Sequence, residues 1–175
     1  MSGPTQIANG ELAMQPVTEP PKPDEDLDFP LVELFFFAYR DFIADADDML
    51  EEYGFGRAHH RVLHFVNRRP GMVVAELLDI LRITKQSLGP VLRQLIESGH
   101  LVQIAGPEDR RQRLLYPTQK GRNLSIELTH MQSRRIKGAI EGIKNKDRES
   151  IRDFLFGMIE PEERDLVNGL MVQDQ

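Results

Sequence analysis

Hydrophobic residues recur at the spacing of an amphipathic helix along most of this chain, and a few defined points break the pattern. The spacing predicts an N-terminal helix over 31–53 that ends at Gly54. It further predicts helices over 57–67, over 73–81, from a Thr84 cap to about Ser98, and from about Gln119 onward. Between them, the apolar segment LVQIA at 101–105 is typical of a strand. The chain is therefore predicted to be mainly helical, with strands in one short region.

The stretch after that strand, EDRRQRLLYPTQKG at 108–121, is the most informative part of the chain. In its turn an acidic residue, Asp109, lies beside three arginines: Arg110, Arg111 and Arg113. Arginine guanidinium groups suit phosphate oxygens and narrow grooves. The order helix, helix, strand, basic turn, strand is that of a winged helix-turn-helix, a mainly α fold with a small β-hairpin. We therefore interpret 108–121 as a wing that grips DNA.

The helix that follows the Thr84 cap has one apolar side and one polar side. The polar side consists of long donors and amides, which suit phosphates and base edges. Together with the cap, the candidate DNA-binding residues of this helix are Thr84, Lys85, Gln86, Ser87, Arg93 and Gln94. A polar helix face is usually only solvated, so the adjacent wing arginines are what favour DNA here.

Helices predicted on both sides of this region suit dimerisation. The helix over 31–53 is apolar on more than one face, which indicates more than one packing partner, and three further apolar stripes follow Gly121. Core packing alone would also account for the N-terminal helix. A subunit interface is the alternative, because a small domain offers few other surfaces and a two-fold DNA operator requires a homodimer.

The predicted domain organisation follows from these assignments. Residues 1–28, rich in proline and acidic side chains, are predicted to form a flexible tail. One domain is predicted over 29–172, with a DNA-binding lobe at 57–121 and dimerisation helices at 29–55 and 122–172.

The net charge of −6 is unevenly distributed along the chain. Residues 57–122 contain 12 lysines and arginines against 5 acidic residues, whereas the rest contains 10 against 23. The candidate DNA-binding lobe is therefore positive, although the whole chain is acidic. Only the local field acts on a phosphate at the surface, so the overall acidity does not exclude DNA binding.

Composition and motifs exclude several other classes of protein. There are no cysteines, so disulfides, thiol redox sensing and cysteine metal sites are unavailable. No apolar run approaches the ~20 residues of a membrane span, and the N-terminus lacks a signal segment. We expect a soluble cytoplasmic protein with no membrane partner and no cofactor. The chain has no phosphate loop, nucleophile motif or metal quartet, so an enzyme is not expected.

One competing function is a protein-interaction module that has kept a winged-helix scaffold but no longer binds DNA. The overall acidity favours this alternative. The local charge disfavours it, because such a module would have little reason to keep three arginines on the wing.

The segment 101–121, with DRR, an alternating strand and TQKG, resembles the wing signature of the MarR family of winged-helix transcription regulators. The segments VVAELLDILRITKQSLGPVLRQLIESGHL and RVLHFVNRRPG resemble that family's helix-turn-helix and the helix before it, and the chain is similar to the PetP-type branch. The resemblance covers roughly 31–171. It implies an obligate dimer with intertwined terminal helices and a recognition helix from each subunit in successive major grooves of double-stranded DNA. It also implies that Arg111 enters the minor groove and that Asp109 orients it by an ion pair.

The resemblance further implies a small aromatic acid effector between the dimer helices and the DNA-binding lobe. His60, Arg61 and His64 are the candidate polar contacts for it. His60 and His64 stand one helical turn apart, a spacing that can hold a metal. No HExxH pattern or cysteine accompanies them, so no metal site is predicted, and packing or lining a cleft is the simpler interpretation.

Two prolines depart from the family pattern. Pro90 falls inside the predicted recognition helix, where it removes a backbone donor. Either the helix continues through Pro90 with a kink, which Thr84 as cap favours, or regular helix begins only at Pro90. Pro117 cannot donate to a strand ladder, so the second wing strand is predicted to end at or before it.

Overall fold

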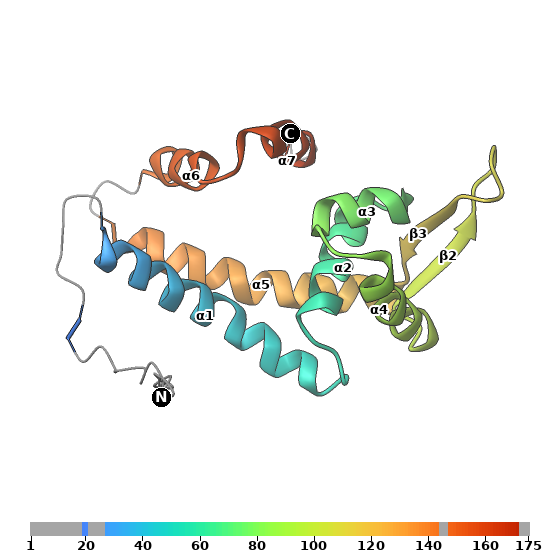
Figure 1. The fold of residues 1–175 in the computed structure, drawn as a ribbon. Helices are drawn as coiled ribbons and strands as arrows, with labels where there is room; N and C mark the ends of the chain where they lie inside the picture. The colour runs from blue at the N-terminus through green and yellow to red at the C-terminus, as the bar shows by residue number, and fades with distance from the viewer. Residues whose placement is uncertain (1–18, 21–26, 144–146, 172–175) are drawn as a thin grey trace, which may run out of the picture. The chain divides into compact units, whose positions relative to one another are not determined.

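The computed structural model describes residues 19–20, 27–143 and 147–171. Within them the elements are α1 (Phe29–Glu51), α2 (Arg57–Arg68), β1 (Met72–Val73), α3 (Val74–Leu81), α4 (Lys85–Glu97), β2 (Leu101–Ala105), β3 (Arg113–Pro117), α5 (Gln119–Glu141), α6 (Arg148–Gly157), the 3-10 helix η1 (Pro161–Glu163) and α7 (Arg164–Met171) (Figure 1). The predicted mainly α fold with a small β-hairpin is confirmed. The predicted tail, 1–28, lies outside the described residues except at 19–20 and 27–28.

Helix α1 crosses the boundary between two compact units, 1–37 and 38–175. Before the boundary it exposes large apolar side chains: Leu31, Val32, Leu34, Phe35, Phe36 and Phe37. After the boundary it buries Ile43, Ala46 and Leu50 in the second unit. The apolar surface predicted for this helix is thus partly core and partly exposed.

The core of the second unit is built around α2, which contacts α3, α4, β3 and α5. The largest completely buried side chains are all hydrophobic except one histidine. They come from these elements, from the end of α1, from β2 and from the turn before β2: Leu50, Val62, Leu63, Val66, Leu77, Leu88, Leu95, His100, Leu101, Leu115 and Leu128. Because α4 contributes its apolar side to this core, its polar side is left for other contacts.

The sheet has three antiparallel strands in the order β1-β3-β2. Strands β2 and β3 form the predicted hairpin, with Leu101 opposite Pro117 and Ala105 opposite Arg113 (Figure 1). The hairpin ends at Pro117, as predicted, because proline has no N–H for the ladder. Strand β1 was not predicted: Val73, expected to begin a helix, pairs with Leu114 instead.

Helix α4 runs without interruption from Lys85 to Glu97 and contains Pro90. The prediction that the helix continues through Pro90 is confirmed, and the alternative of a helix that begins at Pro90 is wrong; the predicted kink stays a prediction. Thr84 caps the helix, since its Oγ1 accepts from the backbone N–H of Ser87 at 3.1 Å. Leu88, Val91 and Leu92 are buried, so packing of the apolar side holds the helix together around a missing backbone donor.

Replacing Pro90 with alanine is therefore expected to stabilise the protein, by up to ~3 kcal/mol. Alanine restores an N–H for the carbonyl of Gln86 and removes the clash of the ring with the preceding turn. Urea unfolding monitored by circular dichroism measures the change. A lower free energy of unfolding would instead mean that the fixed φ of proline is needed in this helix.

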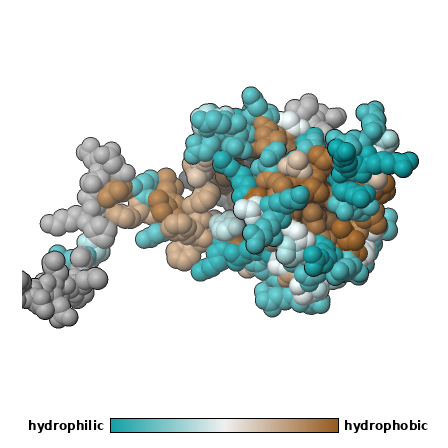
Figure 2. All heavy atoms as spheres, turned by 45° about the vertical axis from the view of Figure 1, so that its right-hand side comes forward, coloured by the Kyte–Doolittle hydropathy of each residue, from teal (hydrophilic) through white to brown (hydrophobic). Residues whose placement is uncertain are grey.

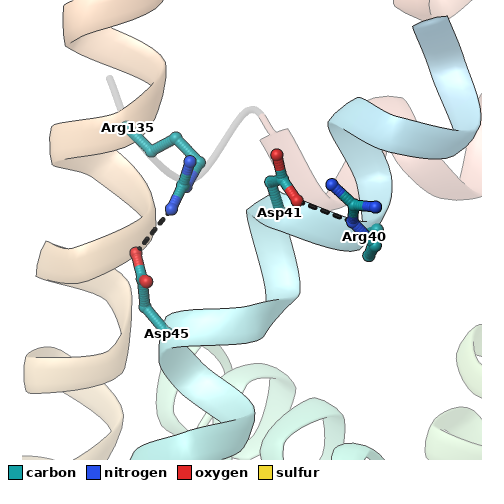
Figure 3. Close-up of polar contacts among 4 residues, drawn as sticks. All are labelled: Arg40, Asp41, Asp45 and Arg135. Carbon is teal, nitrogen blue, oxygen red and sulfur yellow. Dashed lines mark hydrogen bonds and ion pairs between the residues drawn. The ribbon is translucent and has the colours of Figure 1, made fainter.

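An ion pair links α5 to α1 within the second unit. Arg135 of α5 donates from Nη2 to Asp45 of α1 at 2.9 Å, and Arg40 pairs with Asp41 one turn earlier on α1 (Figure 3). All four side chains are well exposed, so each pair is expected to contribute at most ~1 kcal/mol. Only the pair of Arg135 with Asp45 connects two helices, because Arg40 and Asp41 are neighbours on α1.

The C-terminal helices follow the predicted apolar stripes, and η1 separates α6 from α7. Phe154 and Leu155 of α6, and Met158 directly after it, are about half exposed. An ion pair of 3.5 Å joins Glu163 in η1 to Arg82, in the turn between α3 and α4. The C-terminal segment is thus in contact with the helix-turn-helix.

Candidate DNA-binding surface

The first turn of α4 presents a set of exposed polar side chains. Thr84 caps the start of this turn, and its Oγ1 lies 2.9 Å from the Oγ of Ser87. Lys85, Gln86 and Ser87 follow the cap directly and are exposed, as is Arg93 two turns later. Core contacts occupy only the opposite side of the helix, so these side chains are available to a ligand.

The tip of the wing is a tight turn that displays arginines. Gly106 donates to the carbonyl of Gln112 at 3.0 Å, which closes the turn. A Cβ at Gly106 would lie 2.7 Å from the carbonyl oxygen of Asp109, so glycine is needed at this position. Arg110, Arg111 and Arg113 are all exposed on this turn and on the start of β3.

Asp109 orients the tip in a different way from the one expected. Its Oδ1 accepts from the backbone N–H of Arg111 at 2.8 Å. The ion pair expected between Asp109 and the Arg111 guanidinium is not present among the described residues. A backbone contact holds the turn, and the exposed Arg111 guanidinium has no acidic partner among the described residues.

Helix α4 and the wing border one groove of about 740 Å³. Its floor is apolar and includes Val74, Leu78 and Ile96. Its border carries four cations from two elements: Lys85 and Arg93 of α4, and Arg111 and Arg113 of the wing. Figure 2 shows this mixture on the lobe that carries the wing, as hydrophobic surface bordered by hydrophilic side chains.

The cations of this surface are not neutralised within the protein. Among the described residues, no carboxylate lies within 4.0 Å of the charged nitrogens of Lys85, Arg93, Arg110, Arg111 or Arg113. In the part of the chain that the structure describes, Glu97 is the one acidic residue that lines the groove, and it forms no ion pair there. A surface with several free cations on a projecting hairpin and a helix is suited to a polyanion.

Gln94 differs from the other predicted residues of α4, because its amide is used inside the protein. It donates to the carbonyl of Gly54 at 2.9 Å and contacts the ring of His59 at 2.9 Å. Sequence reasoning did not select His59. Its only local signal is its place three residues after Gly56, the position of a capping-box side chain, and its Nδ1 does accept from the Gly56 N–H.

The three predicted effector residues lie on α2 but do not form an open cluster. His60 is buried and His64 is half-buried, and burial lowers the pKa of both rings. The guanidinium of Arg61 donates to the carbonyl of Leu81, at the end of α3, at 3.1 Å. Among the described residues, no three histidine or acidic side chains converge in a way that would hold a metal ion.

Comparison with known proteins connects this geometry to a family. Residues 53–112 match the sequence model of the MarR family. The chain is 42% identical over 130 residues to the HTH-type transcriptional regulator PetP of Rhodobacter capsulatus, and the match covers 74% of this chain and 78% of that protein. The match therefore extends well beyond the helix-turn-helix and the wing.

Solved structures share the fold. Streptococcus pneumoniae FabT in complex with DNA superposes with a TM-score of 0.67 at 14% identity, covering 74% of this chain and 92% of that one. A MarR protein from Peptoclostridium difficile superposes with a TM-score of 0.66 at 17% identity, and the match covers 87% of this chain and 97% of that one. In the described part of the present chain, none of the helices is both long and apolar enough to cross a membrane.

Proposed function

Because the chain belongs to the MarR family of transcription regulators, we propose that it acts as a homodimer that reads DNA with α4 in the major groove and the wing in the minor groove. The chain is a DNA-binding transcription regulator, and its family and relatives are regulators rather than enzymes. The proposal concerns the geometry of binding, the dimer and the control by a ligand.

The observation that carries the proposal is the groove bordered by free cations from two elements. Lys85 and Arg93 on α4 and Arg111 and Arg113 on the wing face one space. Helix side chains suit the major groove, whereas an arginine on a narrow hairpin suits the minor groove. Gln86 and Ser87 would contact base edges or phosphates beside Lys85. Gln94 is the exception, because its amide is already bonded to Gly54 and His59.

Exposed apolar helices support a homodimer. In the single chain, roughly half of the surface is exposed for Phe35, Phe36 and their neighbours on α1, and for Phe154, Leu155 and Met158 at the end of α6. Apolar patches of this kind on the surface of one chain usually mark an interface. A two-fold dimer would present two copies of α4 to successive major grooves.

A small aromatic acid remains our proposed effector, with His60, Arg61 and His64 as its polar contacts. The bond from Arg61 to Leu81 supports a route from such a ligand to DNA binding, since Leu81 directly precedes the turn of the helix-turn-helix. A carboxylate that took up the Arg61 guanidinium would break that bond.

Replacing Arg111 with alanine is expected to weaken DNA binding by ~1 to 3 kcal/mol, because it removes the proposed minor-groove contact. Thermal stability should stay nearly unchanged, because the exposed guanidinium has no partner within the described residues. Fluorescence anisotropy with a fragment of the protein's own promoter measures the affinity.

Two further variants calibrate that experiment. Arg134→Ala removes one exposed arginine from α5, far along the helix from the wing, and should leave the affinity close to that of the wild type. Asp109→Ala should cost less than Arg111→Ala, because it loosens the turn without removing a cation. If Arg111→Ala bound as tightly as the wild type, the wing would have no part in DNA binding.

A further inference from the structure

A closed circuit of hydrogen bonds joins the middle of α4 to the loop between α1 and α2. The Nε2 of Gln94 donates to the carbonyl oxygen of Gly54 at 2.9 Å. The Oε1 of Gln94 lies 2.9 Å from Nε2 of His59, and Nδ1 of His59 accepts from the backbone N–H of Gly56 at 3.1 Å. Both ends of one amide and both nitrogens of one ring are therefore in use.

The circuit requires one protonation state of His59. Because Nδ1 accepts from Gly56, the single proton of the neutral ring is on Nε2, where it donates to Gln94. An imidazolium carries a second proton on Nδ1, which would face the Gly56 N–H donor to donor. Only the neutral ring completes the circuit.

Aromatic packing fixes the ring of His59 in this position. His59 stacks on Phe55, with ring centroids 4.8 Å apart and planes 8° apart. His100, in the turn between α4 and β2, packs edge-on against Phe55 at 5.0 Å and against Tyr53 at 5.7 Å. We call Tyr53, Phe55, His59 and His100 the corner cluster.

The end of α4 is tied to the same cluster by a second set of bonds. The Oγ of Ser98 donates to the carbonyl of Gln94 at 2.6 Å, so it accepts from Nδ1 of His100 at 2.9 Å. The Nε2 of His100 is buried without a partner among the described residues, and burial lowers the pKa of this ring, which favours its neutral form. Two histidines therefore contact the second half of α4. His59 does so only as a neutral ring, whereas His100 uses an Nδ1–H that its neutral and charged forms can both carry.

We propose that His59 and Gln94 are positioning residues for DNA binding, which set the orientation of α4 against the corner between α1 and α2. The inference rests on the proposed reading of DNA by α4. Buried leucines on the other side of α4 fix its depth, but apolar contacts have no preferred direction. Hydrogen bonds are directional, so the Gln94 amide limits how far α4 can rotate. Gln94 thus acts through the placement of Lys85, Ser87 and Arg93 instead of touching a base.

Acidification is expected to open the circuit. Burial lowers the pKa of His59 below its ordinary value of 6.5, and burial together with Lys120 lowers the pKa of His100. The ionizable groups that face the cluster are Tyr53 from the loop, Lys120 from α5 and the two rings, while α4 presents the neutral Gln94 amide. The neutral ring of His59 should therefore hold α4 in its orientation above pH 6.5. This contact should be lost as the pH falls through the lowered pKa of His59.

The test compares four forms of the full chain: wild type, His59→Gln, Gln94→Met and the double variant. Glutamine cannot titrate, yet it can still accept from the Gly56 N–H as a capping-box residue, so α2 should form. Methionine keeps the size of Gln94 and adds no charge. His130→Gln on α5 is the matched control, since His130 is exposed and outside the cluster. Affinity for the promoter fragment is measured by anisotropy at pH 7.5 and 5.5, with the thermal midpoint recorded at each pH.

At pH 7.5 each single variant is expected to bind about three- to tenfold more weakly, the effect of one or two lost hydrogen bonds. The double variant should be no weaker than the weaker single one, because both break the same circuit. The loss of affinity between pH 7.5 and 5.5 should be smaller in His59→Gln than in the wild type and the His130→Gln control.

Additive losses in the double variant would overturn the inference and indicate that Gln94 contacts DNA itself. Variants with a lower thermal midpoint but wild-type affinity and a wild-type pH step would overturn it as well, since the circuit would then serve the fold alone. A wild-type protein that bound no DNA at either pH would overturn both the proposed function and this inference. If the wild type binds the promoter fragment but the variants behave in either of the two ways just described, only the inference fails.

Discussion

Replacing Gly121 with alanine is expected to lower the free energy of unfolding by about 1–3 kcal/mol. A Cβ at Gly121 would overlap the carbonyl oxygen of His100 and lie 2.9 Å from its carbonyl carbon. Neither segment can easily move apart, because Thr118 at the start of α5 donates from its N–H to His100 O at 3.0 Å and from Oγ1 to Gly99 O at 2.7 Å. The new methyl group must therefore strain the joint between α4, β2 and α5.

Gly138 provides the matched control for that experiment, because it lies on the same helix and a Cβ there would meet nothing within 4 Å. Gly138→Ala should stabilise the protein by about 0.5–1 kcal/mol through helix propensity. Thermal unfolding of both variants distinguishes the two effects, because the midpoint should shift by about 2–4 °C for each kcal/mol, downward for Gly121→Ala and upward for Gly138→Ala. Equal midpoints for the two variants would contradict the close approach of α5 to the turn before β2.

Deleting 161–175 is expected to abolish both dimerisation and binding to promoter DNA. Val167 and Met171 of α7 line a groove of about 380 Å³ together with Ile140 of α5 and Leu155 of α6. Removing them would expose still more apolar surface on α5 and α6, next to the proposed interface. A monomer would carry only one copy of α4, so it would lose the additional affinity that a dimer gains by binding two linked half-sites of the DNA.

Light scattering coupled to size-exclusion chromatography measures the mass, and anisotropy measures the binding. Deleting 1–25 is the control, which should leave both the mass and the affinity unchanged. A shortened protein, lacking 161–175, that stayed folded and bound the promoter as a monomer would rule out this role for the C-terminal helices.

Periodicity and capping were enough to predict the helices of the DNA-binding lobe from the sequence. Thr84 caps α4 as expected, and α4 continues through Pro90 because Leu88, Val91 and Leu92 keep one apolar side buried. Such patterns involve residues that are close in the sequence, so they can be recognised without knowledge of the fold. Strand β1 could not be found in this way, since a two-residue strand has no period and exists only because Met72 pairs with Leu115.

The candidate site was predictable in its charges and not in its internal contacts. Charge and exposure of the wing arginines follow from composition and turn chemistry. The contact of Asp109 with the Arg111 N–H, instead of its guanidinium, depends on the local path of the turn. The bond from Gln94 to His59 joins residues 35 positions apart, which no spacing rule connects. The close approach of Gly121 to His100 is likewise a product of tertiary packing.

The salt dependence of binding to the protein's own promoter, compared with a scrambled fragment of the same length, tests the central claim most directly. If Lys85, Arg93 and the wing arginines contact phosphates, log K should fall linearly with log salt concentration, with a slope of about −0.9 for each phosphate neutralised. The promoter should also be bound more tightly than the scrambled fragment at every salt concentration. Equal affinity for the two fragments, or no binding of either at low salt, would contradict sequence-specific recognition of DNA by this surface.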